Sequence, residues 1–164
     1  MTGIDLSATM IEVARLHAQA SDLAINYRVQ SAASLGASAP GMFDCVCCME
    51  LLEHVPEPAI LVAELATLLR PGGLLFCSTI NRTARAFLGA IVAAEYVLGL
   101  LPRGTHTYAR FVPPAELARA GRSAGLELVE IVGLEYDPFS RAARLATGTA
   151  INYLACFTRA PAPP

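Results

Sequence analysis

Two hydrophobic periodicities alternate along the chain, and the switches between them separate expected strands from expected helices. Residues 2–5 are typical of the end of a short strand, and Ser7 is placed to cap a helix that runs to about Ala20. In that helix the apolar stripe consists of Met10, Ile11, Ala14 and residues 16–18. Further strands are expected at residues 25–29, 43–49, 74–79, 126–136 and 151–158.

Proline and glycine mark the limits of the other expected helices. An amphipathic helix over residues 59–69 is followed by the sequence RPGG, so we expect Gly72 or Gly73 to supply a left-handed cap. Pro113 and Pro114 open a helix that reaches about residue 124, and Gly125 ends it. Strands that alternate with helices, followed by two consecutive strands, predict an α/β domain. Its sheet is expected to be mainly parallel with an antiparallel hairpin at the carboxyl end.

Composition and charge narrow the classes of function. The 164 residues suit one domain, and with 54% hydrophobic and 16% charged residues the chain can bury a substantial core. A net charge of −2 without a basic cluster gives no case for nucleic-acid binding. The five cysteines are expected to be buried free thiols in a reducing compartment, because four of them lie in apolar strand-like runs. The spacing of Cys45, Cys47 and Cys48 is not a zinc pattern.

Candidate catalytic and ligand-binding residues lie where expected strands end. Glu50, Glu53 and His54 have spacings of three and four residues, so one helical turn would bring them to a common side. Three interpretations stay open: a divalent metal site, His54 as a general base without metal, and a capped turn with solvated glutamates. Asp5 follows a strand and precedes a helix, a position that suits either ribose binding or helix capping.

Four further residues are candidates for ligand contact. Met49 ends an expected strand and could line a cofactor pocket or belong to the core. Asn81 and Arg82 follow another strand end, where substrate contacts are expected in open α/β sheets. His106, in the sequence GTHTYAR, could line the acceptor site or be an ordinary loop histidine.

Several motifs occur together: TGID, FDCVCCMELLEHVPEP, LLRPGGLLFCSTINR, EYVLGLLPRGTHTYARFVPPAEL and INYLACFTR. With them the chain resembles the ubiquinone-biosynthesis O-methyltransferases over nearly all its residues. The resemblance implies a Rossmann-like class I fold, S-adenosylmethionine as cofactor and a polyprenylated phenol or catechol as substrate. It implies cofactor contacts at Asp5 and Met49, catalytic roles for His54 and Glu50, and a Mg²⁺ site on Glu50, Glu53 and His54. The alternatives are another small-molecule class I methyltransferase, or a non-catalytic remnant that binds lipid or a partner.

The sequence departs from that family at its beginning. The family starts with a helical segment, a first strand and a Gly-rich loop, whereas this chain starts at the end of the second strand. We therefore expect residues 1–164 to form a partial methyltransferase domain, as a fragment or completed by another chain. The missing first strand is central in the class I order, so its absence would leave two strand edges unpaired.

A longer irregular segment is inserted at about residues 81–112. Its apolar part, AFLGAIVAAEYVLGLLP, is too short and too interrupted to span a bilayer, and arginines flank it. Since the implied substrate resides in membranes, we expect this segment to contact membrane lipids at the headgroup level. The implied location is peripheral, on the cytoplasmic face of a bacterial inner membrane or on the mitochondrial inner membrane. A ubiquinone biosynthetic complex is a further implied partner.

Overall fold

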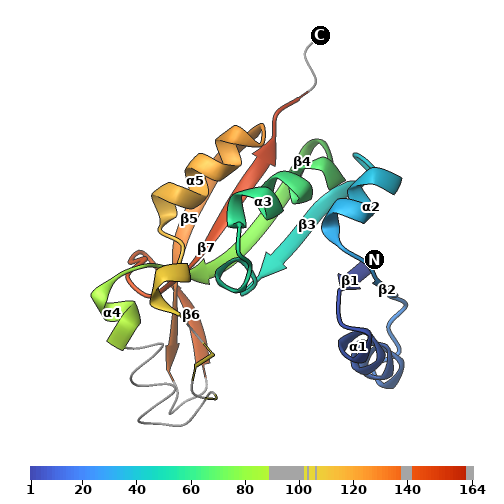
Figure 1. Cartoon of the computed structure of the whole chain (residues 1–164), viewed down its shortest axis with the longest axis horizontal. Coiled ribbons are helices and arrows are strands. Elements are labelled where there is room, and N and C mark those ends of the chain that lie inside the picture. Colours follow the sequence, from blue (N-terminus) through green and yellow to red (C-terminus); the bar gives the residue numbers. More distant parts are fainter. Residues whose placement is uncertain (89–101, 103, 106, 138–141, 162–164) are drawn as a thin grey trace.

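The fold is taken from a computed structural model of the whole chain. It describes every residue except 89–101, 103, 106, 138–141 and 162–164 (Figure 1). In the described part, no helix combines the length and the apolar character needed to cross a bilayer.

The amino-terminal part is a small unit of two parallel strands and a helix. It comprises β1 (Thr2–Asp5), α1 (Ala8–Ala20) and β2 (Asn26–Val29). Ser7 caps α1 as expected, because its hydroxyl accepts a hydrogen bond from the Met10 amide. The expected apolar stripe is only partly buried: Ile11 faces the interior, whereas Leu16 is 67% exposed.

A five-stranded mixed sheet forms the main body, in the order β3-β4-β7-β5-β6. Its strands are β3 (Phe43–Met49), β4 (Leu69–Ile80), β5 (Leu126–Asp137), β6 (Ala142–Ala146) and β7 (Asn152–Arg159). Pairing is parallel between β3 and β4 and antiparallel around β7 and β5. The expected antiparallel carboxyl-terminal strands are present, and β6 extends them by one strand.

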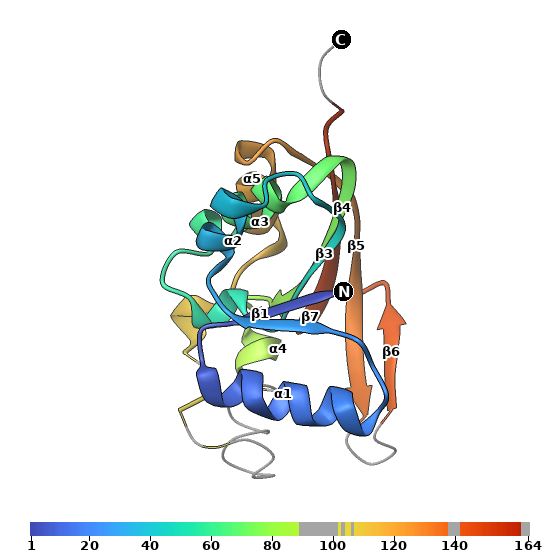
Figure 2. The same cartoon turned by 90° about the vertical axis from the view of Figure 1, so that its right-hand side faces the viewer.

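Helices cover one face of this sheet. They are α2 (Ala32–Ser38), α3 (Pro58–Leu68) and α5 (Pro114–Ser123), and Figure 2 shows them together on one side. Val62 and Leu65 of α3 and Leu117 of α5 pack in the same core as Tyr153 and Phe157 of β7. Each such buried apolar side chain contributes about 1.5–3 kcal/mol relative to an exposed one.

The two sheets are separate in the described chain. β1 pairs only with β2, and β3 pairs only with β4. This division falls where the family resemblance places the first strand, so the described chain shows the expected interruption.

One expected helix end differs in the structure. Helix α3 ends at Leu68 without a glycine cap, because Leu69 is already extended and begins β4. Gly72 does adopt a left-handed conformation, with φ of 75°, but it lies within β4. There the register shifts between Phe43 and Cys45 of the partner strand, so this glycine belongs to a strand irregularity.

Only the ends of the inserted segment are described. They contain the short helix α4 (Ala84–Ala86) and the 3-10 turn η3 (Tyr108–Arg110). The rings of Phe87 and Tyr108 meet edge-on with centroids 5.7 Å apart, so the two ends lie together. Most of the apolar stretch between them falls outside the described residues.

Candidate active site

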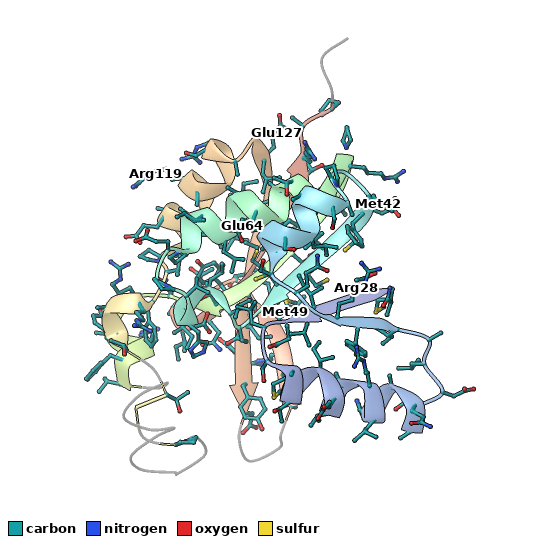
Figure 3. The ribbon with its side chains drawn as sticks, turned by 45° about the vertical axis from the view of Figure 1, so that its right-hand side comes forward. Arg28, Met42, Met49, Glu64, Arg119 and Glu127 are labelled. Atoms are coloured by element: carbon teal, nitrogen blue, oxygen red, sulfur yellow. The ribbon has the colours of Figure 1, made fainter. Side chains whose placement is uncertain are left out.

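The two expected cofactor residues end parallel strands. Asp5 is the last residue of β1, and Met49 is the last residue of β3. The Met49 side chain is 50% exposed at the end of its strand (Figure 3). Ligands of open α/β sheets bind beyond the carboxyl ends of the strands, and each of these residues lies at such an end.

Asp5 begins the turn into helix α1. Its Oδ1 atom accepts a hydrogen bond from the Ser7 amide at 2.7 Å, and the residue is exposed. The carboxylate therefore organises the helix entry. Ribose binding by Asp5 stays a prediction, which the exposure of the side chain allows.

Glu50 follows β3 and is held by Ser78 of the neighbouring strand. The Glu50 amide donates to the Ser78 Oγ atom at 2.9 Å, and that hydroxyl donates to Glu50 Oε1 at 2.6 Å. Glu50 also has a φ of 50°, in the left-handed region. A non-glycine residue pays about 1–2 kcal/mol for that conformation.

Glu53 lies in the buried 3-10 turn η1 (Leu52–His54) and is only 2% exposed. Its Oε2 atom accepts a hydrogen bond from the Thr79 hydroxyl at 2.6 Å. No described residue hydrogen-bonds its Oε1 atom. This carboxylate faces the protein interior.

The two carboxylates are thus directed apart. Ser78 and Thr79 are consecutive residues of β4, and consecutive side chains of a strand point to opposite faces. Among the described residues no group of three His, Cys, Asp or Glu side chains is arranged to hold a metal. His54 is exposed at the end of η1. Metal binding by Glu50, Glu53 and His54 stays a prediction that this geometry does not favour.

Asn81 and Arg82 connect loops around the end of β4. The Asn81 side chain donates to the Thr149 carbonyl at 2.7 Å. Arg82 donates to the Phe111 carbonyl at 2.9 Å and forms an ion pair with Glu116 at 2.8 Å. Arg82 also lines a pocket of about 230 Å³, so substrate contact by these residues stays a prediction. His106 lies outside the described residues.

A buried pair of thiols lies near the carboxyl ends of β3 and β4. Cys48 and Cys77 are register partners on β3 and β4 and face the helix-covered side. Their mutual hydrogen bond lowers the pKa of Cys48 and, with burial, raises the pKa of Cys77. The expectation of buried free thiols holds for this pair and is wrong for Cys45 and Cys47, which are exposed. Strand alternation directs those two to the face that carries no helix.

Sequence reasoning missed Ser78 and Thr79, the two hydroxyl residues that hold the acidic segment. Both lie in an apolar strand, where a serine or threonine gives no sign of a special role. Their position near the carboxyl end of β4, beside a strand that acidic residues follow directly, could have indicated them.

Comparison with known proteins places this geometry in a family. The family model described as a methyltransferase domain matches residues 1–131. The chain belongs to the methyltransferase domain family. Curated relatives carry the name ubiquinone biosynthesis O-methyltransferase, so the resemblance drawn from the motifs is confirmed.

Two of these relatives show the extent of the match. The protein of Thiobacillus denitrificans is 53% identical over 154 residues, which are 94% of this chain and 66% of the relative. The protein of Xylella fastidiosa (strain 9a5c) is 52% identical over 163 residues, which are 99% of this chain and 66% of the relative. The chain therefore spans 66% of the length of each relative.

Solved structures confirm the fold. A SAM-dependent methyltransferase from Methanosarcina mazei superposes with a TM-score of 0.69 at 15% identity, covering 98% of this chain and 82% of that chain. A SAM-dependent methyltransferase from Thermotoga maritima superposes with a TM-score of 0.68 at 20% identity. The match covers 96% of this chain and 72% of that chain. At these identities the likeness supports the class I methyltransferase fold alone.

Proposed function

We propose that the protein transfers a methyl group from S-adenosylmethionine to a phenolic or catechol oxygen of a polyprenylated precursor in ubiquinone biosynthesis. The observation that carries this proposal is identity above 50%, over nearly the whole chain, to proteins named for that activity. Because the chain spans 66% of those relatives, the activity of the whole protein is stated as a proposal.

The described residues fit one part of the cofactor's surroundings. S-adenosylmethionine supplies a methyl group on a positively charged sulfur. The exposed Asp5 carboxylate at the end of β1 suits hydrogen bonds from ribose hydroxyls. The half-exposed Met49 thioether at the end of β3 suits apolar contact with the cofactor.

The acceptor oxygen needs help to become nucleophilic. A phenol has a pKa near 10, so at neutral pH about one molecule in a thousand is ionised. Glu50 and His54 are both exposed beside the strand ends and are the candidate groups to take the phenolic proton. Glu53 is buried, so it does not serve as this base.

Cofactor binding tests the assignment of Asp5. We expect Asp5→Ala to weaken S-adenosylmethionine binding by about 10- to 100-fold, the loss typical of hydrogen bonds to a charged group. The protein for this calorimetric titration is the chain joined to the third of the Thiobacillus relative that it does not match. Ser7→Ala removes the neighbouring helix cap and serves as the control. Equal losses of cofactor affinity in the two variants would show that Asp5 only stabilises the start of helix α1.

We further propose that the inserted segment contacts the cytoplasmic face of a bacterial inner membrane, or the mitochondrial inner membrane in a eukaryote. The described residues that support this are Arg85, Phe87 and Leu88, which are exposed near the start of the inserted segment. A cation followed by exposed apolar side chains suits an anionic lipid surface, where each arginine adds about 1 kcal/mol. A ubiquinone biosynthetic complex remains a further proposed partner.

Flotation with liposomes of defined composition tests the membrane contact. We expect Arg85→Glu to reduce binding to anionic liposomes several-fold and to leave the weak binding to neutral liposomes unchanged. Arg82→Glu changes the same charge, but Arg82 is engaged with Glu116 and Phe111, so it is the matched control with a smaller expected effect. Unchanged flotation of Arg85→Glu would contradict the proposed contact.

A further inference from the structure

Glu50 has a backbone conformation that its residue type does not favour. Its φ of 50° belongs to the left-handed region, which glycine and asparagine adopt more readily. The Glu50 amide is held there by two acceptors of one residue, the Ser78 carbonyl at 3.1 Å and the Ser78 Oγ atom at 2.9 Å. Strained residues that their surroundings hold in place concentrate at functional sites.

The Ser78 hydroxyl performs two tasks at once. It accepts from the Glu50 amide, so its single proton is available to the Glu50 carboxylate, to which it donates at 2.6 Å. Ser78 is 3% exposed, and its hydroxyl is fixed by the sheet. The hydroxyl therefore ties the backbone and the carboxylate of Glu50 to the same point of β4.

Thr79 forms the corresponding bond on the opposite face of β4. Its hydroxyl donates to Glu53 at 2.6 Å, and both residues are almost fully buried. Two adjacent hydroxyls thus separate two carboxylates that are three positions apart in the sequence. Glu50 is exposed directly after the carboxyl end of β3, and Glu53 is buried in the core.

We propose that Ser78 is a positioning residue that fixes the Glu50 carboxylate beyond the carboxyl end of β3, and that Thr79 and Glu53 only anchor the turn. The part that concerns catalysis rests on the proposed methyl transfer. In this arrangement Glu50 meets the acceptor, and Ser78 acts solely through Glu50.

A double-mutant cycle of Ser78 and Glu50 tests whether Ser78 acts through Glu50. We expect Ser78→Ala to lower kcat for methyl transfer by about 10- to 100-fold, within the range of an impaired acid–base group. The KM values for both substrates should change less than about 3-fold. In the Glu50→Ala background, Ser78→Ala should reduce kcat no further, because the residue through which it acts is gone. Ser78→Thr keeps the hydroxyl and should restore most of the activity.

Thr79→Val is the matched control, since it removes the adjacent hydroxyl with little change of shape. We expect it to lower the Tm by a few degrees, because it leaves buried Glu53 without a donor, and to change kcat less than about 3-fold. If Ser78→Ala lowers kcat as much in the Glu50→Ala background as in the unaltered protein, the proposal is overturned. A loss of kcat in Thr79→Val equal to that in Ser78→Ala would overturn it as well.

Thermal unfolding of the 164-residue chain separates this inference from the proposed function. The Tm losses of Ser78→Ala and Glu50→Ala should be non-additive, whatever reaction the protein catalyses. Absent methyl transfer in every variant would refute the proposed function, and additive Tm losses would refute the Ser78–Glu50 link itself.

Discussion

At the scale of single residues, the acidic segment after β3 is governed by hydroxyl groups of β4. Spacing indicated that Glu50, Glu53 and His54 would share one side, as they would on a regular helix. The structure departs from this because Glu50 is left-handed and only residues 52–54 form a 3-10 turn. Sequence spacing drew attention to this acidic segment, and tertiary hydrogen bonds determine where the Glu50 and Glu53 side chains point.

A stability comparison tests the strain at Glu50. We expect Glu50→Gly to have a free energy of unfolding about 1 kcal/mol higher than Glu50→Ala, because both lose the carboxylate but glycine tolerates positive φ. Urea unfolding of the two variants measures the difference. At ordinary positions alanine is the more stable of the two, so an alanine variant equal to or better than glycine would contradict the left-handed conformation.

At the scale of elements, the long apolar strands and the helices α1, α3 and α5 were predictable, and the short elements α2 and β6 were not. Strand β3 has the expected limits, and Pro114 and Gly125 bound helix α5 as expected. The alanine-rich β6 has weak strand propensity and forms by pairing with the edge of β5. The seven-residue α2 contains a glycine, and tertiary packing against α3 supports it.

The contact between helix α5 and strand β7 gives a prediction at this scale. A Cβ atom added at Gly121 would lie 2.5 Å from Cε1 of the buried Phe157 ring. We expect Gly121→Ala to lower the free energy of unfolding by up to about 2 kcal/mol, because overpacking outweighs the gain in helix propensity of about 1 kcal/mol.

Chemical unfolding measures this effect, with Arg119→Ala on the exposed side of the same helix as the control. The free energy of unfolding of Arg119→Ala should lie within about 0.5 kcal/mol of that of the unaltered chain. A Gly121→Ala variant more stable than the unaltered chain would show that α5 does not pack closely on Phe157.

At the scale of the whole molecule, the order of strands and helices was enough to predict the class of fold. The pattern of apolar runs gave the alternation, and the motifs gave the family. Neither could show that Ser78 and Thr79 direct two carboxylates to different faces, because that depends on the register of β3 with β4. The division between β1 and β3 followed from the family resemblance and is visible in the sheet order.

Methyl transfer from isotopically labelled S-adenosylmethionine to a polyprenylated catechol tests the central claim most directly. The protein is the chain joined to the unmatched third of the Thiobacillus relative, and mass spectrometry locates the label. We expect one labelled methyl group on a phenolic oxygen, and a rate at least about 10-fold lower for Glu50→Ala. A folded protein that binds S-adenosylmethionine but leaves the catechol unlabelled, or methylates it at carbon, would contradict the account.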